Sequence, residues 1–257
     1  MTTFNLKRRP EITCAVILYV LLFPSVSHAT GFLIYNQHAA ANALAIAYTA
    51  QVDNPSAVFY NPAAINQLSG TQASFGTVII SPRTKFTSDS TGETSRMKDH
   101  TYVLPNFYLT HKLNEKLSFG IGSFSPFGLS TDWPDDWEGN HLSTYARLRT
   151  FYVNPVVSYQ VHPKLSLAVG FNLIYSDLRF KRALKINPLP LNLGQADLDM
   201  DDIAYGFNLA LSYQITDRIK LGLSYRSSID IEYDGDANFR APRLLKPLLP
   251  EGGVSLD

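Results

Sequence analysis

Cysteine is almost absent from this chain: its one cysteine, Cys14, lies within the first 29 residues. Those residues carry the basic group Lys7, Arg8 and Arg9, then an apolar run over residues 12–23, then the small-residue pattern Ser27-His28-Ala29. The run is shorter than the roughly 20 residues that a membrane-spanning helix needs, so the pattern predicts a cleaved signal peptide over residues 1–29. The exported chain would then have no thiol for a disulfide, a thiolate metal site or a cysteine nucleophile.

An excess of charge of either sign is also missing. The 257 residues include 22 basic and 22 acidic side chains, and removal of the signal peptide would leave the remainder near neutral. A chain without a basic stripe has nothing to neutralise phosphates, so nucleic acid is not an expected partner. The hydrophobic share of 45% and the charged share of 17% are typical of a packed protein rather than a disordered one.

Long apolar runs do not occur after Phe23, which argues against a helical membrane protein. The sequence also lacks a Gly-x-Ser-x-Gly elbow and a Walker loop, and its histidines are scattered. The acids at Asp135-Asp136 and at Asp199, Asp201 and Asp202 lack the spacing of a calcium loop. We therefore expect no enzymatic activity, no metal site and no cofactor.

What the sequence does contain is apolar alternation with a period of two. Between Ile219 and Tyr233 the odd positions are mostly apolar, whereas the even positions are mostly polar or glycine and include Lys220 and Arg226. The same alternation occurs over residues 203–215 and 165–175, and more weakly over 151–161, 117–121, 102–111 and 71–85. These segments predict about seven strands, most of them near or above the ~10 residues that cross a membrane at a tilt.

The connections between these segments alternate in length. Short polar turns are expected at residues 114–115, 162–164 and 216–218, and long loops at 84–98, 124–142, 182–199 and from 234 onward. Short turns on one side and long loops on the other are typical of outer-membrane barrels. A soluble β-sandwich also alternates, but its strands are shorter. The pattern therefore favours an all-β fold, a transmembrane antiparallel β-barrel.

Two segments do not fit a self-sufficient barrel. Residues 30–67 show no alternation and offer a small-residue helix candidate at 39–50 and a turn-rich stretch at 53–62. Residues 241–257 form a loop that contains Pro and Gly, with no closing strand after it. Seven strands alone would leave open edges that lipid cannot satisfy. We therefore expect the sequence to be the first part of a larger barrel.

Three short matches connect the chain to a known family. The segment Asp-Asn-Pro-Ser-Ala-Val-Phe-Tyr-Asn-Pro-Ala at residues 53–63 resembles the hatch motif of the FadL/TodX family of outer-membrane transporters for long-chain fatty acids and aromatic hydrocarbons. Residues 125–133, with Trp137-Glu138-Gly139, resemble the end of the third strand and its following loop, and Thr30-Gly31-Phe32 is a weaker match. The resemblance implies a signal peptide at 1–29, an N-terminal partly helical hatch at 30–67 and the first half of a barrel at 68–257.

The resemblance also implies a set of site residues. A ligand groove among the extracellular loops would include Trp133 and Trp137, aided by Phe124 and Phe127. Gly128 matches the glycine at a strand kink where the barrel opens sideways, and Pro126 beside it lacks a ladder donor. Arg182 aligns with an arginine that contacts the fatty-acid carboxylate. Asn61, Pro62 and Ala63 would have structural and gating roles.

Each assignment has an ordinary alternative. The aromatic residues could form an interface belt or pack the loop internally, and Gly128 could be a plain strand end. Arg182 could face solvent or lipopolysaccharide phosphate, and the Asn-Pro-Ala motif could be a simple helix-start turn.

The sequence thus predicts an exported barrel protein of the bacterial outer membrane, and the resemblance implies that it takes up hydrophobic compounds passively. Long-chain fatty acids are the preferred substrate class and aromatic hydrocarbons the other. The expected partners are these small molecules together with outer-membrane lipid and lipopolysaccharide. Two other functions remain open: a lipase-like barrel enzyme, which would need a Ser/His/acid site, and an adhesin or structural barrel whose loops bind a partner.

Overall fold

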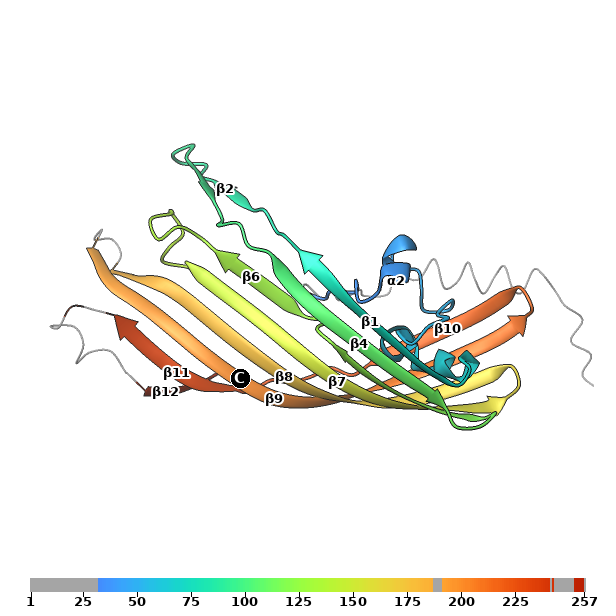
Figure 1. Cartoon of the computed structure of the whole chain (residues 1–257). Coiled ribbons are helices and arrows are strands. Elements are labelled where there is room, and N and C mark those ends of the chain that lie inside the picture. Colours follow the sequence, from blue (N-terminus) through green and yellow to red (C-terminus); the bar gives the residue numbers. More distant parts are fainter. Residues whose placement is uncertain (1–31, 187–190, 241, 243–251, 257) are drawn as a thin grey trace, which may run out of the picture. The chain divides into compact units, whose positions relative to one another are not determined.

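A computed structural model of the chain describes residues 32–186, 191–240, 242 and 252–256. The signal peptide expected at residues 1–29 lies outside these residues. Most of the described residues belong to one antiparallel sheet of ten strands (Figure 1). Within the same residues, the helices are all too short or too polar to cross a membrane. The predicted all-β fold is confirmed.

The sheet pairs its strands largely in sequence order. The path runs through β1 (Thr71–Ile80), β4 (Tyr102–Lys112), β5 (Leu117–Phe124), β7 (Tyr145–His162), β8 (Leu165–Ile186), β9 (Leu191–Thr216), β11 (Tyr233–Arg240) and β12 (Gly252–Leu256). Off this path, β6 (Gly128–Asp132) pairs with β7 and β10 (Ile219–Arg226) pairs with β9, while β2 (Lys85–Thr87) and β3 (Thr94–Arg96) form a separate hairpin. The N-terminal segment, which we define as residues 32–68, contains helix α2 (Ala39–Ala43), helix α3 (Ala57–Tyr60) and 3-10 helix η1 (Pro62–Gln67).

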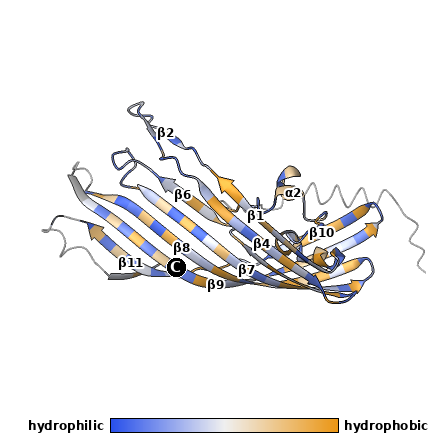
Figure 2. Cartoon of the chain, in the orientation of Figure 1, coloured by the Kyte–Doolittle hydropathy of each residue, from blue (hydrophilic) through white to orange (hydrophobic). Residues whose placement is uncertain are grey.

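The two faces of the sheet differ in polarity, and the alternation is visible along the strands in Figure 2. The outer face carries large apolar side chains that are exposed among the described residues, such as Phe75, which is 78% exposed. The inner face, which contacts the N-terminal segment, is lined by small polar side chains such as Asn154, which is 0% exposed. A soluble β-sandwich would place its apolar face inside. The observed polarity is that of the wall of a membrane barrel, although the described sheet is open, with β1 and β12 at the two ends of its path.

The N-terminal segment packs on the inner face of the sheet. Its apolar residues join a buried cluster that also includes Tyr108, Phe124 and Tyr152 from three strands. The helix expected at residues 39–50 forms only in its first part, because Ala45 and Ile46 have left-handed φ values of 48° and 68° that end it. The stretch expected as turns at residues 53–62 instead contains α3 and leads directly into η1.

The prediction of a loop at residues 182–199 is wrong, because β8 and β9 occupy most of this range and pair with each other. Both faces of the hairpin carry polar groups there, including the ion pair between Lys181 and Asp197 at 2.8 Å, so the apolar alternation that reveals a strand is absent. The strand expected over residues 219–233 is also interrupted. It ends at Arg226, and Tyr233 begins β11, which continues along β9 through residues expected as loop. The loop expected at residues 241–257 is also corrected, because β12 lies within it and pairs with β11.

The other two long loops contain short strands that the sequence did not indicate. Residues 84–98 include β2 and β3, and residues 124–142 include β6. The short turns expected between β4 and β5, between β7 and β8 and between β9 and β10 are confirmed by these strand bounds.

Candidate ligand-binding site

The sheet is interrupted between β5 and β6. Phe124 at the end of β5 pairs with Tyr152 of β7, and Gly128 at the start of β6 pairs with Arg149. Three residues of one strand therefore face two of the other, as in a bulge. β4 pairs with β5 only as far as Phe107, and in the described part of the chain β6 pairs with β7 alone. A gap in the hydrogen-bonded sheet follows between β4 and β6.

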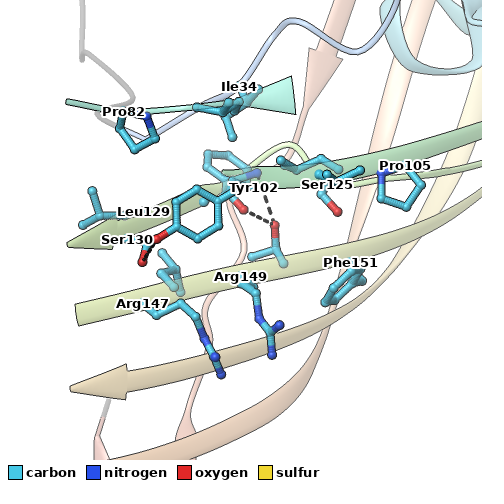
Figure 3. Close-up of a pocket in the computed structure, with 17 residues that line it drawn as sticks. Ile34, Pro82, Tyr102, Pro105, Ser125, Leu129, Ser130, Arg147, Arg149 and Phe151 are labelled. Carbon is cyan, nitrogen blue, oxygen red and sulfur yellow. Dashed lines mark hydrogen bonds between the residues drawn. The ribbon is translucent and has the colours of Figure 1, made fainter. Parts of the chain in front are cut away.

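A cavity of about 320 Å³ lies at this break (Figure 3). Its lining is mostly apolar and includes Ile34, Pro105, Phe127, Gly128 and Leu148. Polar side chains in the lining bond to other protein groups: Tyr102 donates to the Ser130 hydroxyl at 2.7 Å, and Thr150 donates to the Phe127 carbonyl at 2.9 Å. A concave apolar space of this size suits a small hydrophobic ligand.

The first described residues of the N-terminal segment bind to the edge of this break. The Ile34 N–H donates to the Pro126 carbonyl at 2.6 Å, and the Gly128 N–H donates to the Phe32 carbonyl at 3.5 Å. Leu33 and Phe127 form the isolated antiparallel bridge between these two bonds. The backbone groups that β6 leaves unpaired at its start are therefore satisfied by residues 32–34.

The Asn-Pro-Ala motif fixes η1 against the sheet. The Asn61 side-chain oxygen accepts from the Ala63 N–H at 3.2 Å, and its amide nitrogen donates to the carbonyls of Thr49 and Leu211 at 2.9 and 3.2 Å. Pro62 stands in the first turn of η1, where its missing N–H costs nothing. Ala63 packs with Ala168 and Ala210 in a small buried cluster. The motif is both a helix start and an anchor to the sheet.

Polar bonds hold the rest of the N-terminal segment to the inner face. Asn66 donates to Ser158 at 2.7 Å and accepts from Ser118 at 2.8 Å. The Tyr60 hydroxyl donates to the Tyr35 carbonyl at 2.7 Å. Burial raises the pKa of Tyr60 to about 12, so this donor stays protonated at neutral pH. The segment is thus held by many separate hydrogen bonds rather than by a covalent tie.

The predicted aromatic residues separate into two groups. Trp133 and Trp137 stack at 4.5 Å between ring centroids, and Phe86 of β2 meets Trp137 edge-on at 5.5 Å. Phe124 lies elsewhere, buried against Phe59 of α3 at 4.9 Å. The tryptophan pair links two loops, while Phe124 belongs to the cluster beneath the N-terminal segment.

A polar contact supports the same loop region. Lys98 and His100 both bond to Asp132 at 2.9 Å. The hydrogen bond that Lys98 donates to Asp132 is the main reason why the pKa of Lys98 is raised.

Arg182 lies on β8 opposite Ala196, and its side chain is exposed. Alternate residues of a strand share a face, and the pairing of β8 with β9 has no bulge between residues 172 and 182. Arg182 therefore lies on the same face as Asn172, a buried residue of the inner face. Its neighbours Arg179 and Lys181 form ion pairs with Asp197, whereas Arg182 makes no ion pair with any described residue.

Arg226, at the end of β10, is a further cation on the inner face that the sequence did not single out. Its guanidinium carbon lies 4.9 Å from the centroid of the Phe59 ring and 5.3 Å from that of Phe124. In the sequence, only its even position in the alternating segment pointed to Arg226. That position placed it on the polar face but did not indicate which residues it contacts.

Comparison with known proteins agrees with this geometry. A family model described as outer membrane protein transport protein (OMPP1/FadL/TodX) matches residues 20–251. The chain belongs to this family. The expected resemblance to FadL/TodX proteins is therefore confirmed, and family members are outer-membrane proteins of bacteria.

Several known members align with much of this FadL/TodX-family chain. It is 26% identical over 249 residues to the long-chain fatty acid transport protein of Escherichia coli O6:H1 (strain CFT073). This alignment covers 86% of this chain and 55% of that protein. The crystal structure of a Pseudomonas aeruginosa FadL homologue matches with a TM-score of 0.68 at 20% identity, over 82% of this chain and 56% of the other. The Ralstonia pickettii toluene transporter TbuX matches with a TM-score of 0.61 at 20% identity, over 79% and 58%. The chain spans about half the length of these relatives.

Proposed function

We propose that this FadL/TodX-family chain is part of an outer-membrane channel for the passive uptake of hydrophobic compounds, chiefly long-chain fatty acids. The observation that carries the proposal is the apolar cavity at the break between β5 and β6, where residues 32–34 satisfy the free strand edge. A sheet in lipid cannot leave backbone groups unpaired. A break that is closed by a separate segment is therefore suited to open when that segment moves.

Ligand capture is assigned to the loops. The stacked pair Trp133 and Trp137 offers an aromatic surface to an oily molecule that arrives from outside. Arg182, an exposed cation on the inner face of β8, is then placed to meet a carboxylate head group with a bidentate donor fork. Phe124 and Phe127 continue the apolar lining towards the break.

Gating is assigned to the N-terminal segment, which acts as the hatch. Asn61, Pro62 and Ala63 hold η1 to the sheet, and residues 32–34 cover the break. Gly128 and Pro126 shape the opening itself, because Pro126 has no N–H and Gly128 starts the displaced strand. When the hatch shifts, the ligand leaves sideways through the gap between β4 and β6.

The outer face fits a lipid environment. Its apolar band would contact acyl chains, and the charged residues farther along β7 and β8 would lie at the level of lipopolysaccharide. Asp177, for example, binds Arg147 and Arg149 at 2.8 Å each. We place the exported protein in the bacterial outer membrane, with cleavage after Ala29 and a mature start at Thr30.

The cations on the inner face support long-chain fatty acids as the substrate class. One relative is named for long-chain fatty acids and one structural neighbour for toluene. A neutral hydrocarbon needs only an oily lining, whereas a fatty acid also needs a cation for its carboxylate. Transport, not catalysis, is the activity that these residues support.

The test is uptake of radiolabelled oleate and of toluene by cells that lack this protein, before and after the native protein is restored. Restoration should raise oleate uptake, and the protein should fractionate with outer membranes. Unchanged oleate uptake at normal outer-membrane levels of the protein would contradict the proposal. A rise in toluene uptake alone would support the proposed channel but show that its substrate is an aromatic hydrocarbon.

A further inference from the structure

Arg226 presents a positive charge on the inner face with no acidic partner among the described residues. Its guanidinium rests against the rings of Phe59, Phe124 and Tyr152, the last at 5.8 Å from its centroid. The one hydrogen bond that it makes within the described residues goes to the Phe59 carbonyl and is long, at 3.4 Å. A guanidinium has five N–H donors, so most of its donor capacity is unused.

A second unused donor stands beside it. Asn208 of β9 is the direct cross-strand partner of Arg226, so the two side chains share a face. Asn208 is buried, and its side-chain oxygen accepts from Asn154 at 2.9 Å and from Asn172 at 3.4 Å. Its own amide nitrogen has no acceptor among the described residues. A buried donor without an acceptor is costly, and an accepting group would satisfy it. The Asn154 and Asn172 side-chain oxygens beside it likewise have no donor within the described residues.

Aromatic rings connect this pair to the cavity at the break. Phe124 stacks on Tyr152 at 5.7 Å between centroids, and Tyr152 lies 6.3 Å from Phe127. Phe127 in turn lines the cavity. A line of ring contacts therefore connects the cation with the cavity that residues 32–34 close.

We propose that Arg226 and Asn208 form an internal receptor for the carboxylate of an amphiphilic ligand, whose alkyl chain lies along Tyr152 and Phe127 towards the cavity. The carboxylate accepts from the unused N–H groups of Arg226 and from the Asn208 amide, which has no acceptor within the described residues. It also competes with the Phe59 carbonyl for the guanidinium, so binding weakens one tie of the N-terminal segment. This inference rests on the proposed function and adds to it a head-group site within the sheet.

The test compares oleate with oleyl alcohol, which has the same chain and no charge, in equilibrium binding to the purified native protein in detergent. In Arg226→Gln the dissociation constant for oleate should rise about ten-fold or more, the loss expected for a charge-assisted hydrogen bond. The dissociation constant for oleyl alcohol should stay nearly constant. Arg226→Lys keeps the charge and loses the bidentate donor geometry. Its dissociation constant for oleate should lie between those of the unaltered protein and of Arg226→Gln.

Asn208→Asp tests the second donor with little change in shape. The aspartate keeps an oxygen for Asn154 and Asn172, but it replaces the free donor by a negative charge next to Arg226. Oleate binding should weaken at least as much as in Arg226→Gln. Lys220→Gln is the matched control, because Lys220 lies on the same face of β10 and already bonds to Gln67 at 2.5 Å. Oleate binding should be unchanged in that variant.

The outcomes separate the two proposals. If the unaltered protein binds neither ligand, the proposed function fails and the receptor with it. If it binds both and Arg226→Gln weakens both equally, Arg226 only supports the N-terminal segment and the receptor is disproved. The receptor is equally disproved if Arg226→Gln leaves oleate binding unchanged while Arg182→Gln weakens it.

Discussion

Gly128 begins β6, directly after the break in the sheet. A Cβ atom there would lie 3.5 Å from the Ile34 side chain and 3.7 Å from the Leu148 carbonyl, which are ordinary contact distances. Alanine therefore fits, whereas the branches of valine would press on Ile34 and fill the cavity. The small side chain matters here for the space that it leaves open, not for the backbone conformation.

We therefore expect Gly128→Val to reduce oleate uptake by cells, while the purified protein still binds oleate. Exit fails in this variant and capture does not. Gly128→Ala is the matched control and should transport at nearly the normal rate. Normal uptake in Gly128→Val would show that the ligand leaves by another route.

Gly222 is required for a different reason. A Cβ atom on it would lie 2.6 Å from the Thr49 carbonyl and 2.8 Å from the Ala50 Cα, both of them backbone atoms. The N-terminal segment can approach β10 this closely only because position 222 has no side chain.

Gly222→Val should displace this part of the N-terminal segment at a cost of about 1–3 kcal/mol, the usual cost of overpacking. The displaced segment should let small polar solutes leak through, which single-channel conductance in planar bilayers measures. Ser224→Val is the control, because Ser224 is exposed on the same face of the same strand. Equal conductance in the two variants would mean that the segment does not seal the path.

At the scale of elements, alternation predicted a strand wherever one face was apolar. It located the membrane-level parts of β8 and β9, where Leu173 and Tyr205 point outward and Asn172 points inward. It failed farther along the same strands, where cross-strand ion pairs such as Lys181–Asp197 stabilise a hairpin that is polar on both faces. Period-two patterning detects the membrane band, not the whole strand.

The candidate site divides in the same way. The family resemblance implied a kink at Gly128, with Pro126 nearby, and both residue types can disturb a ladder. The pairing of residues 32–34 with that break could not be predicted, since backbone hydrogen bonds have no side-chain signature. The surroundings of Arg226 were equally hidden: its three rings come from α3, β5 and β7, and only the fold brings them together.

The loop cluster of Trp133, Trp137 and Phe86 belongs to this scale as well. If the cluster captures ligand, Trp137→Ala should raise the oleate concentration for half-maximal uptake by several-fold and leave the maximal rate unchanged. Truncation of the ring removes apolar contact area without changing the later steps. An unchanged concentration dependence would show that the tryptophans only pack the two loops.

At the scale of the whole molecule, the described part of the chain reverses the polarity of a soluble protein. The outer face is apolar and uncovered, while the inner face is lined by Ser and Asn and covered by the N-terminal segment. The same segment both forms hydrogen bonds with polar groups of the inner face and closes the break in the sheet. The central claim is that transport requires this segment to leave the break.

A disulfide between cysteines at positions 33 and 127 tests that claim most directly. Leu33 and Phe127 face each other between two hydrogen bonds, the antiparallel pair geometry with the shorter Cα separation, which suits a disulfide. Leu117 and Tyr159 form a comparable pair between β5 and β7, where no movement is expected, and provide the control. The only natural cysteine, Cys14, lies in the expected signal peptide.

The measurement is oleate uptake by cells that carry each double-cysteine variant, under oxidising conditions and after reduction. We predict that the Leu33→Cys/Phe127→Cys protein takes up little oleate when oxidised and recovers when reduced, whereas the Leu117→Cys/Tyr159→Cys protein transports equally in both states. Full uptake through a fully cross-linked 33–127 pair would contradict the account, because the ligand would then pass while the N-terminal segment stays on the break.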